Sequence, residues 1–140
     1  MFDIFKKKIK KEDADDKFVN SAALLIHAAK IDENYTEKEK LIIKKTLKDL
    51  GVNENKIDKV YDEAVKIEKN SNQILEFTRE IKNSNEEFKI KITETLWNII
   101  YSDGSSDIYE SNFMRRLTGL LYLDKKVVGD IQERVKNKKK

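Results

Sequence analysis

Apolar residues recur at helical spacing along nearly the whole 140-residue chain, and no stretch shows the alternating pattern of a half-buried strand. Helix start signals separate the periodic stretches. Residues 36–39 and 84–87 fit the S/T-x-x-E capping box, residues 107–110 are its aspartate version, and residues 50–53 contain a glycine stop followed by an asparagine cap. The pattern predicts an all-α bundle with a short basic N-terminal helix near 2–11 and seven helices, near 14–31, 37–50, 54–68, 72–82, 85–101, 108–121 and 125–136.

The chain also contains an internal repeat. One constant offset aligns 25–64 with 96–135 without a gap and places Leu25 on Leu96, Asp32 on Asp103 and Glu39 on Glu110. The apolar period and both loop patterns stay in register. We therefore expect two similar three-helix units that bury their apolar faces against each other in one pseudo-symmetric domain.

The formal charge of +3 is unevenly distributed. Residues 1–11 and 136–140 each carry a net charge of +4, so the body between them is acidic, at −5. A basic N-terminal arm (1–11), a single helical domain (12–136) and a lysine tail (137–140) are the expected divisions. Because the folded body is acidic, nucleic acid is not an expected partner.

Composition removes several classes of chemistry. The chain has no cysteine and a single histidine, His27, so thiol nucleophiles, Cys/His zinc sites and iron–sulfur clusters are excluded. His27 lies opposite the apolar line of its helix, which predicts a boundary or solvated position, whereas Trp97, Phe77 and Phe113 are expected in the core. We expect no enzymatic activity, because paired loop carboxylates such as Asp103 and Asp107 do not make a cleft.

Two acidic segments are the main candidate binding sites. Segments 32–39 and 103–110 each carry a net charge of −3 and each place Asp, six residues, then Glu between two expected helices. Clustered oxygen ligands are what calcium or magnesium requires. The candidate cation ligands are Asp32, Glu39, Asp103 and Glu110, with Asp107 and Glu37 as further candidates.

Helix capping is the alternative explanation of the same residues. Glu39 and Glu110 stand where a capping box places its glutamate, but capping accounts for neither Asp32 nor Asp103. Neither segment is an EF-hand, because the sixth and twelfth positions counted from Asp103 or Asp32 lack the required Gly and Glu.

The sequence resembles the tellurite-resistance TerB family, and in particular its small stand-alone bacterial members. The resemblance covers roughly residues 1–135 and rests on residues 22–32, 77–79, 95–104, 110 and 115–117, together with the Met-Phe-Asp start and Phe5. It implies an all-α bundle of about seven helices and a part in tellurite or general stress resistance, with suggested roles in metal sensing and membrane-associated complexes. If the family's acidic sites transfer, they fall on Asp32, Glu39, Asp103 and Glu110. Glu33 stands where a Gly usually follows the first Asp, so the two segments need not share one geometry.

The N-terminal arm is the second candidate site. Its helical spacing puts Phe2, Phe5 and Ile9 on one face, flanked by Lys6, Lys7 and Lys8, a pattern typical of a helix lying on an anionic membrane surface. An arm whose apolar edge packs onto the bundle is the equal alternative. The longest apolar run, residues 22–26, is too short to cross a bilayer, and no signal peptide is recognisable, so a cytoplasmic location is expected, with peripheral association at the inner membrane face as a further option.

These observations predict a non-catalytic interaction or sensor protein that presents two acidic helix–loop–helix junctions to a protein partner or a divalent cation. The alternative is a peripheral membrane scaffold anchored by the basic arm.

Overall fold

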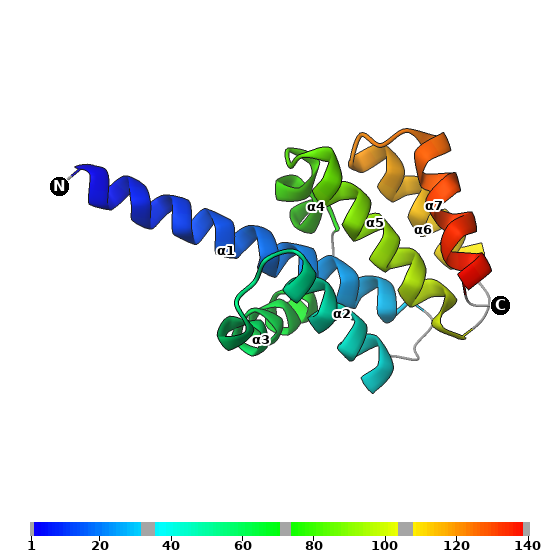
Figure 1. Cartoon of the computed structure of the whole chain (residues 1–140), viewed down its shortest axis with the longest axis horizontal. Coiled ribbons are helices and arrows are strands. Elements are labelled where there is room, and N and C mark those ends of the chain that lie inside the picture. The colour runs from blue at the N-terminus through cyan, green and yellow to red at the C-terminus, as the bar shows by residue number, and fades with distance from the viewer. Residues whose placement is uncertain (1, 32–35, 71–73, 104–107, 139–140) are drawn as a thin grey trace.

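The computed structural model describes residues 2–31, 36–70, 74–103 and 108–138, with side chains for residues 16–31, 36–70, 74–102 and 109–138. Within these ranges all regular structure is helical. The elements are α1 (Phe2–Ala29), α2 (Glu37–Asp49), α3 (Glu54–Asn70), α4 (Leu75–Lys82), α5 (Glu86–Ile100), a 3₁₀ turn η1 (Tyr101–Asp103), α6 (Ile108–Leu120) and α7 (Lys125–Lys138), as Figure 1 shows. The all-α prediction is confirmed.

The N-terminal prediction needs a correction. A separate short helix over 2–11 was expected, but the helix α1 runs without a break from Phe2 to Ala29. The segment between the two expected helices contains neither Pro nor Gly, so no residue in it breaks a helix. None of the described helices is long and apolar enough to cross a membrane.

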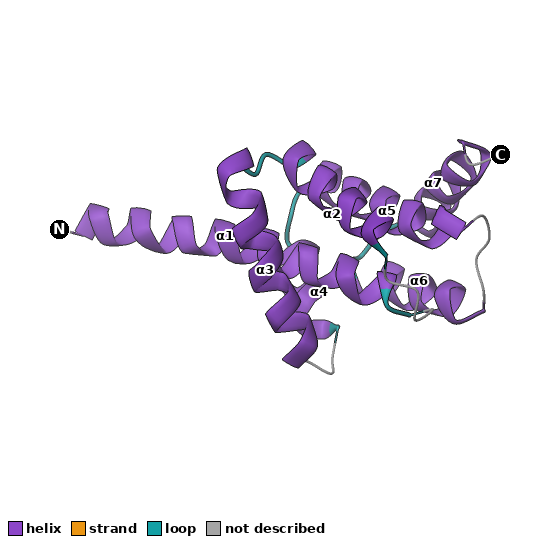
Figure 2. Cartoon of the chain, turned by 90° about the horizontal axis from the view of Figure 1, so that it is seen from below, coloured by secondary structure: helices purple, strands orange, loops and turns teal. Residues whose placement is uncertain are grey.

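The C-terminal half of α1 forms the centre of the core. Its residues 22–26 are completely buried, and α1 packs against α2, α3, α4 and α5. A helix that is apolar on all sides must be surrounded by other elements, which explains why this stretch takes the central position. The helix α5 lies between α2 and α7 and supplies the second apolar row, including Ile92, Leu96 and Ile100 (Figure 2). Trp97 and Phe77 are buried as predicted, and Phe113 is half-buried against the core.

Two tight turns end α2 and α6 with the same hydrogen bonds. At the first, the Val52 N–H donates to the Leu47 carbonyl and the Gly51 N–H to the Lys48 carbonyl, both at 3.0 Å. At the second, the Leu123 N–H donates to the Thr118 carbonyl at 3.1 Å and the Tyr122 N–H to the Gly119 carbonyl at 3.3 Å. The repeat aligns these four residues with the four of the first turn. This is the Schellman arrangement, which needs a left-handed residue: Gly51 has φ +107° and Tyr122 has φ 56°.

The helix bounds follow the offset of the sequence repeat. The last residues of α1 and α5 are equivalent in the repeat, and so are those of α2 and α6. The first residues of α3 and α7 are also equivalent, and each follows a capping side chain, Asn53 or Asp124, that accepts from the backbone N–H two positions on. The relation of the two three-helix units in space stays a prediction.

The helix start signals have different outcomes. The capping box at α2 is confirmed: the Thr36 backbone N–H donates to Glu39 Oε2 at 3.0 Å, and the Thr36 hydroxyl also contacts this oxygen. At α5 the box was placed one residue too early. The N-cap is Asn85, whose side chain accepts from the Phe88 N–H at 2.9 Å, while the Ser84 hydroxyl donates to the Glu80 carbonyl of the preceding helix. The box at 107–110 begins outside the described residues.

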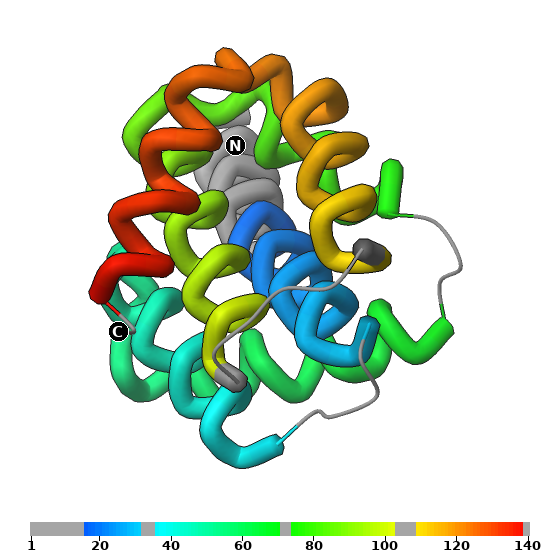
Figure 3. Tube along the Cα trace, turned by 90° about the vertical axis from the view of Figure 1, so that its right-hand side faces the viewer, coloured from blue at the N-terminus to red at the C-terminus, as the bar shows by residue number. Residues whose placement is uncertain are grey.

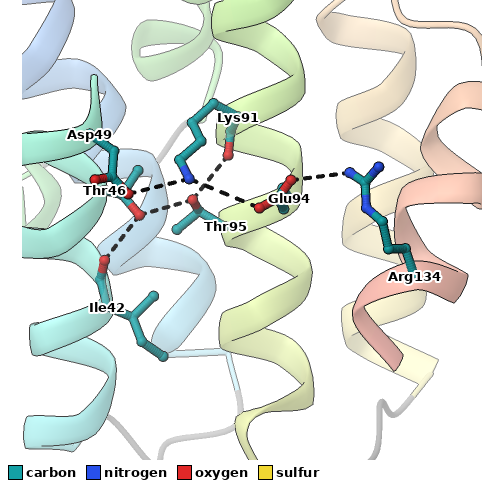
Figure 4. A network of polar contacts seen from close by, with 7 residues as sticks. All are labelled: Ile42, Thr46, Asp49, Lys91, Glu94, Thr95 and Arg134. Carbon is teal, nitrogen blue, oxygen red and sulfur yellow. Dashed lines mark hydrogen bonds and ion pairs between the residues drawn. The ribbon is translucent and has the colours of Figure 1, made fainter. Parts of the chain in front are cut away.

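A polar network joins α2, α5 and α7 across the bundle (Figure 4). Lys91 of α5 pairs with Asp49 of α2 at 3.3 Å, and Glu94 of α5 pairs with Arg134 of α7 at 3.1 Å. Beneath the ion pairs, the buried hydroxyls of Thr46 and Thr95 are 2.9 Å apart, and each lies within hydrogen-bond distance of a carbonyl oxygen of its own helix. Because a hydroxyl has one hydrogen, one threonine donates to the other, which in turn donates to its own helix. The network connects the three helices through polar side chains, in addition to their packing in the core.

Candidate functional site

The two acidic segments connect helix ends that lie at one end of the bundle. The C-terminal ends of α1 and α5 and the N-terminal ends of α2 and α6 all lie on the right-hand side of Figure 1, the side that faces the viewer in Figure 3. Segment 32–39 connects α1 to α2, and segment 103–110 connects α5 to α6. The fold therefore brings the flanks of both predicted binding segments to the same end of the molecule.

Glu39 joins the two segments directly. While Oε2 holds the cap of α2, Oε1 accepts a hydrogen bond from the Ser102 hydroxyl at 3.0 Å, and the neighbouring Lys38 ammonium donates to the Ser102 carbonyl at 3.0 Å. Ser102 precedes Asp103 in η1. The first turn of α2 is thus fastened to the residue that leads into the second acidic segment.

The Glu39 carboxylate is stabilised in its charged form. The side chain is only 7% exposed, and its burial by itself raises the pKa. The hydrogen bonds from Thr36, Ser102 and the backbone of Glu39 together outweigh this, and they lower the pKa below the usual value of 4.5. A carboxylate held in this way is an anion at neutral pH, but its lone pairs already serve the fold.

Glu110 and Glu37 lie in contrasting surroundings. Glu110 is buried in the first turn of α6, where it is 3% exposed and interacts with another group. Glu37 is exposed in the first turn of α2. Both positions suit a carboxylate, because the N-terminus of a helix carries partial positive charge.

The remaining predicted ligands fall outside what can be placed. Asp32 and Asp107 lie outside the described residues, and Asp103 is described in its backbone only, within η1. Among the described residues no group of three or more His, Asp or Glu is arranged to hold a metal ion. The cation ligands therefore stay a prediction. The side chains of Phe2, Phe5, Lys6, Lys7, Lys8 and Ile9 are likewise outside the described part of the chain.

Sequence reasoning missed two partners. Ser102 lies 63 positions from Glu39 and has no motif that marks it as a partner. Glu68 was also missed: it is buried in α3, 2.7 Å from the Lys30 ammonium and 3.4 Å from Nδ1 of His27. His27 is about one third exposed and its ring lies 5.9 Å from that of Phe113, so the boundary position is confirmed, but with an acidic partner. The sequence places His27 and Lys30 on the same polar face of their helix, and this was the one signal that could have pointed to an acidic partner.

The fold and the site together define an all-α bundle, with seven α-helices among the described residues, in which the described flanks of the two acidic segments lie at one end. A family model described as "Tellurite resistance protein TerB" matches residues 18–133, most of the chain. The chain therefore belongs to the TerB family. The search of curated proteins and the search of solved structures each found no match.

Proposed function

We infer that this protein is a non-catalytic binding module with a part in tellurite or general stress resistance, which presents its two acidic junctions to a divalent cation or to a protein partner. The observation that carries the proposal is the contact of Glu39 with Ser102, since it draws the two acidic segments together at one end of the bundle. Family membership supports the link to tellurite resistance.

Within this function, Glu39 and Glu110 organise the site. Both are buried in first helical turns, and Glu39 is already saturated with hydrogen bonds. The groups available to a ligand are then Asp32, Asp103, Asp107 and the exposed Glu37. In this proposal the two buried glutamates fix the helix ends, and the other four carboxylates bind the ligand. Carboxylate oxygens favour calcium or magnesium.

Thermal unfolding with added metal tests the cation. A metal ion present at 100 times its dissociation constant stabilises the fold by about 2.7 kcal/mol, which raises the melting temperature by several degrees. We expect such a rise with millimolar CaCl₂ or MgCl₂, and its loss in Asp32→Asn/Asp103→Asn. Asp16→Asn is the matched control, because Asp16 is an exposed acid on α1 outside both segments.

A pull-down tests the protein partner. Wild-type protein should recover a partner from cells under tellurite or oxidative stress, and the Asp32→Asn/Asp103→Asn variant should not, whereas Asp16→Asn should. No melting shift at 5 mM metal combined with identical recovery by all three proteins would refute the proposal.

A second candidate function is a peripheral membrane scaffold. The backbone of α1 is helical from Phe2 onward, so Phe2, Phe5 and Ile9 share one helix face, with lysines beside them. Sedimentation with vesicles containing anionic lipid should recover the whole chain and not a version that lacks residues 1–11. Equal recovery of both, or equal recovery with neutral vesicles, would exclude the anchor.

A further inference from the structure

A cavity of about 380 Å³ opens between α5, α6 and α7, which are coloured yellow-green, yellow to orange and red in Figure 3. Its volume lies within the range of small-molecule sites. Within the described part of the chain, no carboxylate of the acidic segments lines it, so we treat it as a site separate from the one proposed above. Its described lining includes Ser111 and Arg115 of α6 and Lys125, Gly129 and Gln132 of α7.

The cavity combines an apolar wall with positive charge. Trp97, Met114 and Val128 are buried side chains that form the apolar part. Arg115 and Lys125 bring two cations, and none of the described lining residues is acidic. Neither cation has an ion pair within the described part of the chain. An apolar group that ends in an anion matches this lining in both respects.

Trp97 adds a second observation. Its indole N–H is buried and has no acceptor, the only such side-chain atom among the described residues. The ring is fixed by stacking on Tyr101, with centroids 5.8 Å apart, and the Tyr101 hydroxyl accepts from Gln132 at 2.9 Å. Buried donors in proteins are nearly always paired, so this unpaired donor marks Trp97, a residue of the cavity lining, as incompletely satisfied.

The residues of α2 and α3 that the repeat aligns with this lining contact one another. There, at the equivalent positions of the first repeat unit, the buried Tyr61 ring lies 5.4 Å from the Lys40 ammonium and 5.2 Å from that of Lys44, which also pairs with Asp58 at 2.8 Å. In the second unit three of these positions hold smaller, uncharged residues: Gln132 for Tyr61, Ser111 for Lys40 and Gly129 for Asp58. The fourth keeps a cation, Arg115 for Lys44.

These replacements remove bulk and an acidic group from the second unit. The ring and the carboxylate that occupy the first unit are absent from the second, while its cation is kept and loses its acidic partner. A cavity that arose from poor packing alone would not be expected to keep the cation. We propose that the cavity between α5, α6 and α7 binds a small organic anion, an apolar chain or ring that ends in a carboxylate or phosphate.

Trp97 is the only tryptophan of the chain, so its fluorescence reports on the cavity directly. We expect octanoate to change this fluorescence with saturation in the millimolar range or below, and octanol and acetate to bind at least about tenfold more weakly, since each offers only one of the two features. Octyl phosphate compared with inorganic phosphate repeats the comparison for the other headgroup.

Variants separate the contributions. Arg115→Gln and Lys125→Gln should each weaken octanoate binding by roughly fivefold and leave octanol binding unchanged. Arg116→Gln and Lys126→Gln are the matched controls, because both are exposed neighbours that do not line the cavity. Gly129→Leu should abolish binding by filling the space, while Gly129→Ala, whose Cβ meets no atom within 4 Å, should keep the fold and most of the binding.

Three results would overturn the proposal. The first is that neither octanoate nor octyl phosphate gives a saturable fluorescence change up to about 10 mM, a concentration at which even a weak site would fill. The second is that octanoate and octanol bind equally well. The third is that the cavity variants and their matched controls lose the same amount of binding. The melting temperature of each variant identifies any that fails to fold, and the remaining variants then decide the outcome.

Discussion

At the residue scale, Glu39 shows how one carboxylate can serve two elements. It caps its own helix through Thr36 and contacts η1, the turn that follows α5, through Ser102. Its charged form is therefore favoured in the folded chain despite its burial, and its folded pKa lies below the 4.5 of a free glutamate. The unfolded chain consequently binds more protons in the interval between the two pKa values.

This predicts an acid-sensitive contribution to stability. Because the pKa of Glu39 is lowered on folding, its contribution is fully present above about pH 5.5 and is lost as the pH falls through the folded pKa. Glu39→Gln should lower the free energy of unfolding by about 1–3 kcal/mol at pH 7, and by progressively less towards pH 3. Urea unfolding across this range measures both.

Glu37→Gln is the matched control, since Glu37 is exposed in the same helical turn. It should cost only a few tenths of a kcal/mol, through the weaker interaction with the helix dipole. A pH-independent loss in Glu39→Gln, or equal losses in both variants, would show that the hydrogen bonds of Glu39 do not hold its charge.

At the scale of the elements, two glycines should respond in opposite ways to the same change. Gly51→Ala forces an alanine to φ +107° and should lower the free energy of unfolding by about 1 kcal/mol. Gly129→Ala lies inside α7, where a Cβ meets no atom within 4 Å, and should raise it by about 0.5–1 kcal/mol. Thermal or urea unfolding of the two variants compares them, and equal signs would contradict the assigned backbone conformations.

The turn after α6 offers the reverse experiment. Tyr122 takes a left-handed conformation, φ 56°, that costs a residue with a side chain roughly 1 kcal/mol, and its ring is 73% exposed, so little packing is lost with it. Tyr122→Gly should therefore leave stability unchanged or raise it by up to about 1 kcal/mol. A loss above about 1 kcal/mol in urea unfolding would mean that the exposed ring makes a stabilising contact.

At the scale of the whole molecule, packing and not the polar network should hold the bundle together. Leu96 is completely buried in α5, and Leu96→Ala should cost about 2–5 kcal/mol. The Glu94–Arg134 pair is partly exposed, so a double-mutant cycle with Glu94→Gln and Arg134→Gln should give a coupling of only about 0.2–1 kcal/mol. Urea unfolding of the wild type, Leu96→Ala and the three variants of the cycle compares the cost of Leu96→Ala with the coupling. A coupling above about 2 kcal/mol would contradict the expectation that packing dominates.

The salt dependence of the pair provides an independent check. The coupling between Glu94 and Arg134 should fall further in 1 M NaCl, where exposed charges are screened within about 3 Å, whereas the cost of Leu96→Ala should not fall. The ion pairs then fix which faces of α2, α5 and α7 meet, while apolar burial supplies most of the free energy.

The sequence by itself determined the helices. Local signals lie within a few residues of each other, so the capping box of α2, the glycine stop at Gly51 and the apolar period gave most of the helix bounds to within a few residues. The errors are also local. A continuous α1 replaced two expected helices because no residue breaks it, and Asn85 replaced Ser84 because both can cap and the preceding helix takes the Ser84 hydroxyl.

Only the tertiary structure decided which distant residues meet. The Ser102 partner of Glu39 and the Glu68 partner of Lys30 lie 63 and 38 positions away, and their contacts depend on how helices cross and not on any local preference. The cavity between α5, α6 and α7 is likewise a feature that only the packing of the helices decides. Small residues such as Gly129 are visible in the sequence, but whether they leave a cavity depends on which side chains of neighbouring helices reach the same space.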